Sequence, residues 1–215
     1  MRLVYFIFLS FSLFISCNDN KQNSIEIYLL KNRKLNSEGV QINTIKDYNE
    51  MDTVKLKSYI PYTTFDTIKN DFIYSSKFEF KNEDLNIEPF IDNNEINSLD
   101  INNGKLVLNN SGARKLFKLR PSGRNGEQFV IKVNDSAVFS GYFYNSISSY
   151  GSDWNCINID FSELVKDSTK TNYSFDFFKG NGIDFTKREK IDFKKYPELL
   201  EAFKESDRLK EDKNN

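Results

Sequence analysis

Histidine is absent from this chain of 215 residues. Without an imidazole the protein cannot use a histidine general base, a Ser-His-Asp triad or the usual histidine-containing zinc sites. Asp and Glu side chains could still bind a metal ion, but their spacing does not match that of a calcium-binding loop. A phosphate-binding loop is also not indicated, because no glycine-rich stretch lies between an expected strand and an expected helix. We therefore expect neither a cofactor nor a metal ion.

The chain also lacks a basic excess. Its 30 Lys and Arg residues are balanced by 31 Asp and Glu residues, which leaves a formal net charge of −1. This balance provides no electrostatic attraction for nucleic acid, and we expect no nucleic-acid partner. Four prolines and nine glycines are too few for a fibrous or linker-dominated protein, whereas 20 Phe and 11 Tyr are enough to form a core.

The N-terminal apolar run is too short to span a membrane comfortably. Arg2 is followed by about fourteen apolar and small residues, roughly 21 Å as a helix, against a hydrocarbon core of ~30 Å. A basic residue, a short apolar run and a small residue before a cut are typical of a secretory signal peptide. We interpret residues 1–16 as the signal peptide and 17–24 as a polar tether; a single-pass membrane anchor is the alternative.

The end of this run, Phe14-Ile15-Ser16-Cys17, resembles the lipobox of bacterial lipoproteins, although leucine is more usual than Phe14. The resemblance implies that Cys17 carries acyl chains such as palmitate, becomes the first mature residue and is anchored in a lipid bilayer. In lipoproteins an Asp directly after the cysteine resembles an inner-membrane retention signal. This position is Asn18 here, so the resemblance implies the outer membrane, with the protein in the periplasm. Removing residues 1–16 deletes one basic and no acidic residue, so the mature net charge is near −2.

The second cysteine, Cys156, has no partner in the chain once Cys17 is acylated. It lies in an alternating stretch that puts its side chain on the same strand face as Trp154. This pattern predicts that Cys156 is a buried small hydrophobe, and a reactive thiol is the alternative.

The remaining residues, 25–212, predict a single α+β domain with a mostly antiparallel sheet. The signals are weaker over 25–88 and clearest over 89–178. Strands are expected over 25–30, 54–60, 105–108, 128–133, 137–144, 154–161 and 173–178, with a hairpin turn at 134–136. Helices are expected over 111–120 and 197–210, and a short helix over 93–98.

Two helix starts carry specific signals. Asp92 and Glu95 have the spacing of a capping box. Asn110 or Ser111 can cap the 111–120 helix, whose apolar stripe consists of Ala113, Leu116 and Phe117.

Residues 92–147 contain a series of short motifs: Asp92-x-x-Glu95-Ile96, residues 104–108, a Gly-Ala pair followed by Lys115-Leu116, and residues 129–133. These motifs are similar to the head subdomain of the first periplasmic domain of SecD. The likeness covers about 55 of the 215 residues, and the transmembrane bundle of SecD has no counterpart here. The resemblance implies a short helix, a strand, a helix and a hairpin in a periplasmic binding or scaffold fold, without protein translocation.

The candidate recognition surface consists of Tyr142, Tyr144, Tyr150 and Trp154, which lie among Ser, Asn and Gly residues. Rigid aromatics among small polar residues are typical of loops that bind protein, peptide or sugar. The alternative interpretation is that these aromatics cover one end of the core.

Three acidic pairs could be imagined as catalytic: Glu79 with Glu83, Asp92 with Glu95, and Asp160 with Glu163. Asp92 and Glu95 are better explained as a cap, and Asp160 as the cap of the turn that follows it. We therefore name no catalytic residue. The leading hypothesis is a non-enzymatic, membrane-anchored envelope lipoprotein that binds an envelope protein or glycan; the alternative is an envelope hydrolase acting on carbohydrate through an unidentified carboxylate pair.

Overall fold

A computed structural model describes residues 23–34, 40–41, 64–66, 71–148, 152–163, 170–181 and 188–211. The predicted signal peptide, Cys17, the predicted strand over 54–60 and Tyr150 lie outside these residues. Among the described helices, none has the length and apolar character needed to cross a membrane.

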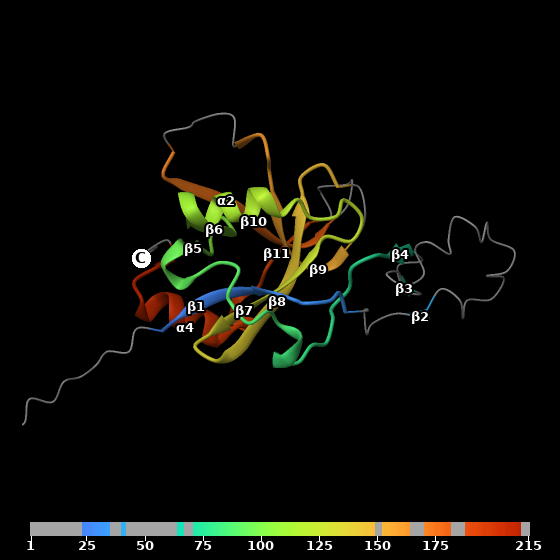
Figure 1. Ribbon diagram of the computed structural model, residues 1–215, viewed down its shortest axis with the longest axis horizontal. Coiled ribbons are helices and arrows are strands. Elements are labelled where there is room, and N and C mark those ends of the chain that lie inside the picture. The colour runs from blue at the N-terminus through green and yellow to red at the C-terminus, as the bar shows by residue number, and fades with distance from the viewer. Residues whose placement is uncertain are drawn as a thin grey trace, which may run out of the picture.

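The fold is α+β, as predicted, and its large sheet is mostly antiparallel (Figure 1). The strand order is β1-β7-β8-β9-β10-β6-β5-β12, and β11 pairs with β10. Only the β8–β9 and β5–β12 pairs are parallel among the described strands. The strands are β1 (Ile25–Leu29), β5 (Ile96–Asp100), β6 (Lys105–Asn109), β7 (Glu127–Val133), β8 (Ser136–Asn145), β9 (Ser152–Ile159), β10 (Asn172–Asn181), β11 (Glu189–Lys190) and β12 (Leu209–Lys210).

A second, small sheet lies to one side of the large one in Figure 1. It consists of β2 (Val40–Gln41), β3 (Thr64–Asp66) and β4 (Asp71–Ile73), all antiparallel. Among the described residues, three single-turn 3-10 helices connect other elements: η4 (Asn82–Asp84), η5 (Asn93–Glu95) and η7 (Phe193–Lys195). The predicted 93–98 helix is therefore correct only for its first turn, because Ile96 already begins β5.

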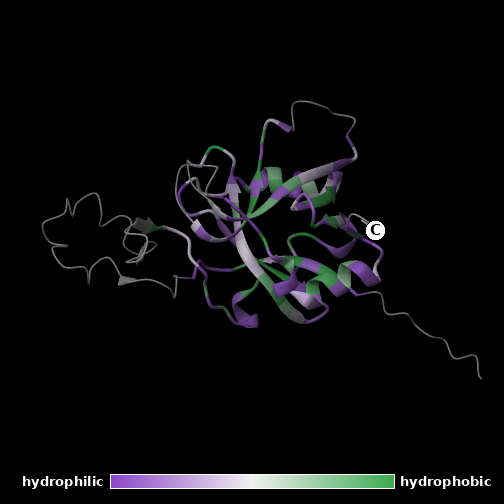
Figure 2. Cartoon of the chain, turned by 180° about the vertical axis from the view of Figure 1, so that it is seen from behind, coloured by the Kyte–Doolittle hydropathy of each residue, from purple (hydrophilic) through white to green (hydrophobic). Residues whose placement is uncertain are grey.

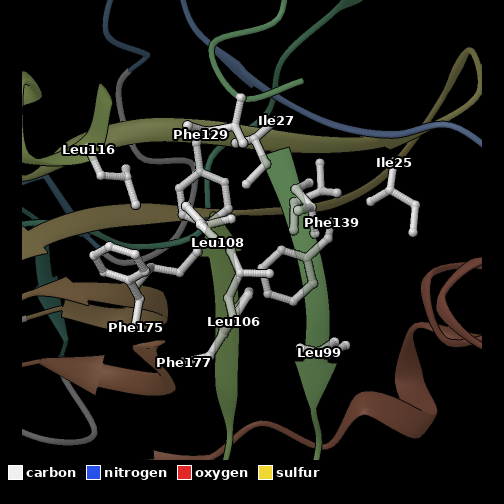
Figure 3. Packing of buried hydrophobic residues seen from close by; sticks show 14 of the residues in the cluster. Ile25, Ile27, Leu99, Leu106, Leu108, Leu116, Phe129, Phe139, Phe175 and Phe177 are labelled. Carbon is white, nitrogen blue, oxygen red and sulfur yellow. The ribbon is translucent and has the colours of Figure 1, made fainter. Parts of the chain in front are cut away.

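The large sheet curves until its first strand meets the segment before β5. Ile27 of β1 donates its backbone N–H to Ile91 over 3.0 Å, and Phe90 donates back to Ile27 over 2.8 Å. The enclosed core receives side chains from β1, β5, β6, β7, β8, β10 and helix α2, which converge between crossing strands in Figure 3. The labelled residues of that core are Ile25, Ile27, Leu99, Leu106, Leu108, Leu116, Phe129, Phe139, Phe175 and Phe177.

Helix α2 (Asn110–Leu119) packs against β6 and β10. The cap is Asn109, one residue earlier than predicted: its side chain accepts a hydrogen bond from the backbone N–H of Gly112 over 3.0 Å. The predicted stripe of Ala113, Leu116 and Phe117 is buried, as expected for an amphipathic helix. Figure 2 shows the matching pattern, with hydrophobic residues along the inner strands and hydrophilic residues in the loops.

Helix α4 (Pro197–Glu205) begins with proline in its first turn, as predicted, but ends earlier than residue 210. The Ser206 hydroxyl donates to the carbonyl of Ala202 over 2.6 Å, and Asp207 then adopts a left-handed φ of 55°. The chain turns there, and Leu209–Lys210 form β12 alongside β5. Backbone pairing with β5 therefore replaces the last helical turn that the sequence pattern favoured.

The outer face of β7, β8 and β9 is covered as well. Residues 75–85 lie over it and contribute Phe78 and Leu85 to a second apolar cluster. The strand residues in this cluster are Val130, Tyr142, Tyr144, Cys156 and Phe178, with Trp154 packed at its margin. Both faces of these central strands are therefore buried.

Candidate functional site

The predicted recognition surface is wrong for two of its residues. Tyr142 and Tyr144 are 0% exposed, because the segment from Ser75 to Leu85 covers the outer face of β8. Trp154 is half-buried, and its indole N–H donates to Ser140 Oγ over 3.2 Å. The alternative, in which these aromatics cover one end of the core, is closer for Tyr142 and Tyr144, but both are full members of a second buried cluster.

The two tyrosine hydroxyls belong to a buried polar network. Tyr142 donates to the carbonyl of Ser76 over 2.6 Å and accepts from Gln128 Nε2 over 3.2 Å. Tyr144 donates to Ser75 Oγ. Burial raises the pKa of both phenols, so they stay neutral and act through hydrogen bonds alone.

Ser75 and Arg33 connect this network to the loop before β7. Ser75 Oγ donates to the carbonyl of Asn125 over 2.9 Å. Arg33 donates from Nη1 to the carbonyls of Asn125 and Gly126, over 2.9 and 3.3 Å, and from Nη2 to Ser75 Oγ over 3.3 Å. The guanidinium also lies over the Tyr142 ring, 5.4 Å from its centroid. The loop is therefore held in place by side chains from two distant parts of the sequence.

A cavity of about 170 Å³ opens beside this loop. Gly126 sits in its wall with a left-handed φ of 63°, which brings the backbone close to β8. Gln128 closes another side and donates and accepts hydrogen bonds with the backbone of Lys34. The lining residues are Leu30, Arg33, Ser122, Asn125, Gly126, Glu127 and Gln128.

Among the lining residues, Glu127 is the charged one whose carboxylate is available to accept hydrogen bonds. Its side chain is half-buried, yet its carboxylate makes no hydrogen bond or ion pair with any residue that the structure describes. Burial raises the pKa of this carboxyl group, and the nearby Arg33 charge opposes that shift. An ionised carboxylate in this setting can accept hydrogen bonds from a bound molecule.

The Asp92–Glu95 pair has a structural role, as predicted. Their capping box forms, with the Asp92 N–H donating to Glu95 over 2.9 Å. Lys115 Nζ lies 3.0 Å from Asp92 and 2.7 Å from Glu95, and Ser111 Oγ also donates to Glu95. Burial alone would raise the pKa of Glu95, but the hydrogen bonds from Lys115 and Ser111 outweigh it and lower that pKa.

The other two acidic pairs do not form a cleft. Asp160 accepts from the Ser162 N–H over 2.9 Å, which is the predicted turn cap. Glu163 is paired with Lys170 over 2.8 Å, and the cavity beside them is about 30 Å³, the space of roughly one water molecule. Glu79 and Glu83 are exposed. No group of three or more potential metal ligands occurs in the part of the chain that the structure covers.

Cys156 is buried, as predicted, with 0% exposure. It shares the outer cluster with Trp154, on the face that the alternation indicated. Burial raises the pKa of its thiol to about 12, so the thiolate needed for nucleophilic chemistry is scarce at neutral pH.

Comparison of the chain with protein-family models, curated proteins and solved structures gave no match. The candidate site therefore rests on its own geometry. Sequence reasoning missed both Arg33 and Glu127, which are 94 residues apart and meet only because β1 pairs with β7.

Proposed function

We propose that this protein is a lipid-anchored, non-enzymatic binding domain of a bacterial envelope, attached through Cys17 and binding its partner at the Glu127 cavity. The lipobox-like sequence at residues 14–17 supports the anchor, and its flanking Asn18 favours the outer membrane. Acyl chains on one cysteine contribute about 0.8 kcal/mol for each buried CH₂, and two or more chains are enough for stable anchoring.

The observation that carries the binding role is the unused hydrogen-bonding capacity of Glu127. A half-buried carboxylate with no hydrogen bond from the described residues takes its hydrogen bonds from water or from a ligand, and carboxyl groups whose pKa is shifted by burial cluster at functional sites. The surrounding loop is rigid, because Arg33 and Ser75 hold the carbonyls of Asn125 and Gly126. A preformed, water-accessible acceptor on a rigid wall favours ligand binding.

The chemistry of the cavity favours a neutral, hydroxyl-rich ligand such as the end of an envelope glycan. Glu127 can accept hydrogen bonds from two hydroxyl groups, while the positive charge of Arg33 opposes the entry of a cation. A volume of about 170 Å³ is below the ~300–1,000 Å³ of sites that enclose a whole drug-sized ligand, so the cavity holds one end of a larger molecule.

Glu127 is the one carboxylate among the lining residues. Glycoside hydrolysis commonly requires two carboxyl groups flanking the bond that is cleaved. The arrangement therefore supports binding better than hydrolysis.

Anchoring is tested with the Cys17→Ala variant in cells fed a labelled fatty acid. We expect the label and the membrane association to be lost together. Label incorporation or membrane fractionation that survives the substitution would contradict anchoring through Cys17.

Binding is tested by titrating the purified protein with glycan fragments prepared from the envelope and following ligand signals by saturation-transfer NMR. We expect Glu127→Gln to weaken binding at least tenfold, because charge-assisted hydrogen bonds are about twice as strong as neutral ones. Glu201→Gln on the exposed face of α4 is the matched control and should bind as the wild type does. Equal binding by the two variants would place the ligand elsewhere.

A further inference from the structure

The chain enters the domain at one end of β7, and the Glu127 cavity lies at the other. β1 and β7 are antiparallel, with Ile25 opposite Val133 and Leu29 opposite Phe129. Glu127, the first residue of β7, is six residues from Val133, a separation of ~20 Å at the usual rise of a strand. In Figure 1, β1 starts beside α4 and runs away from it along β7.

Several hydrogen bonds hold Asn23 and Ser24, the residues just before β1, against the β7–β8 turn and α4. Asn134 in the β7–β8 turn donates from its backbone N–H to Ser24 over 2.8 Å, and its Nδ2 donates to Asn23 Oδ1 over 2.9 Å. The Asn23 amide also donates to Glu205 at the end of α4, and Arg208 lies within 3.5 Å of the Asn23 carbonyl. Residue 23 is therefore part of the folded domain.

The covalent chain between the predicted lipid and this fixed point is short. Six peptide units join Cys17 to Asn23, and they span at most about 20 Å even when fully extended. The predicted attachment point therefore lies within about 20 Å of Asn23, which contacts the β7–β8 turn and the end of α4.

We propose that the end of the domain formed by the β7–β8 turn and the C-terminal end of α4 faces the surface of the anchoring membrane, while the Glu127 cavity opens away from it. The partner of the cavity is then a component outside that bilayer, not one of its lipids. This inference rests on the proposed lipid attachment at Cys17.

The orientation can be measured by energy transfer from single labels on the protein to an acceptor dye on lipid headgroups. The full-length protein, extracted with its native acyl chains, is labelled at Asp135→Cys in the turn or at Gly123→Cys beside the cavity. Asp135 is exposed, and a Cβ at Gly123 meets no heavy atom within 4 Å. The native Cys156 stays unlabelled because it is buried with a thiol pKa of about 12.

In phosphatidylcholine–phosphatidylglycerol vesicles we expect markedly stronger transfer from the Asp135→Cys label than from the Gly123→Cys label. Equal transfer, or stronger transfer from Gly123→Cys, overturns the orientation while leaving the anchor intact. Flotation of each sample with the vesicles tests the lipid anchor separately from the orientation of the domain. Acylated protein that does not float, or a Cys17→Ala protein that does, refutes the anchor itself.

Discussion

Gly126 in the cavity wall permits a strong test of the loop geometry. Its φ is 63°, and a Cβ added there would lie 2.7 Å from the carbonyl oxygen of Phe143 and 3.0 Å from the Tyr144 ring. The left-handed conformation costs about 1–2 kcal/mol for a residue with a Cβ. Because the contact with Phe143 involves backbone, relieving it requires the loop or β8 to move. We therefore expect Gly126→Ala to destabilise the protein by about 2 kcal/mol or more.

Gly123 in the same loop is the matched control. Its φ is not in the left-handed region, and a Cβ there meets nothing within 4 Å, so Gly123→Ala should change stability by no more than about 0.5 kcal/mol. In urea unfolding followed by tryptophan fluorescence, the midpoint should fall for Gly126→Ala alone. In a thermal scan, about 2 kcal/mol corresponds to a decrease in Tm of ~4–8 °C for a domain of this size. Similar shifts for both variants would refute the assigned loop geometry.

Leu116→Ala should lower the free energy of unfolding by about 2–5 kcal/mol in the same assay, because Leu116 is completely buried between α2 and the sheet. Cys156 should resist a maleimide reagent in the native protein at pH 7 and react fully in urea; rapid native labelling would contradict its burial. The pKa of Glu95 is lowered in the folded state, so its contribution to stability is present above its ordinary pKa of 4.5 and is lost as the pH falls through the lower folded value. Lys115→Met should therefore reduce stability at pH 7 more than at pH 3, and an equal loss at both pH values would argue against the Lys115–Glu95 interaction.

Elements with local sequence signals were predicted well. The β7–β8 hairpin formed within a residue or two of its expected bounds, because alternation and the turn residues near Asn134 act over short distances. Helix α2 was predicted for the same reason, from its cap and its apolar stripe. The short helix, the strand over 105–109, the helix and the hairpin follow one another over 92–147 as expected, but β5 is an additional strand that was not expected. Kinship to the SecD head subdomain stays a prediction.

Features that depend on distant pairing were not predictable from the sequence. The parallel alignment of β8 with β9 and the pairing of Leu209–Lys210 with β5 have no local signature. Tyr142 and Tyr144 were misassigned because aromatics among small polar residues are typical of binding loops, whereas both lie in β8 and residues 75–85 cover them. Glu127 begins a strand, where a charged residue usually indicates only an exposed end.

The packing of residues 75–85 against β8 accounts for both the buried outer face of the sheet and the candidate site. Covering β8 buries the Tyr142 and Tyr144 hydroxyls, which then need partners inside the protein and find them in Ser76, Ser75 and Gln128. Ser75 and Arg33 extend these contacts to the carbonyls of the loop before β7, so the polar groups of the cavity wall are satisfied by the protein itself. Glu127 is the charged lining residue outside this network, so its carboxylate is available to a ligand. Because the wall around it is already ordered, a ligand loses less free energy in ordering the site when it binds.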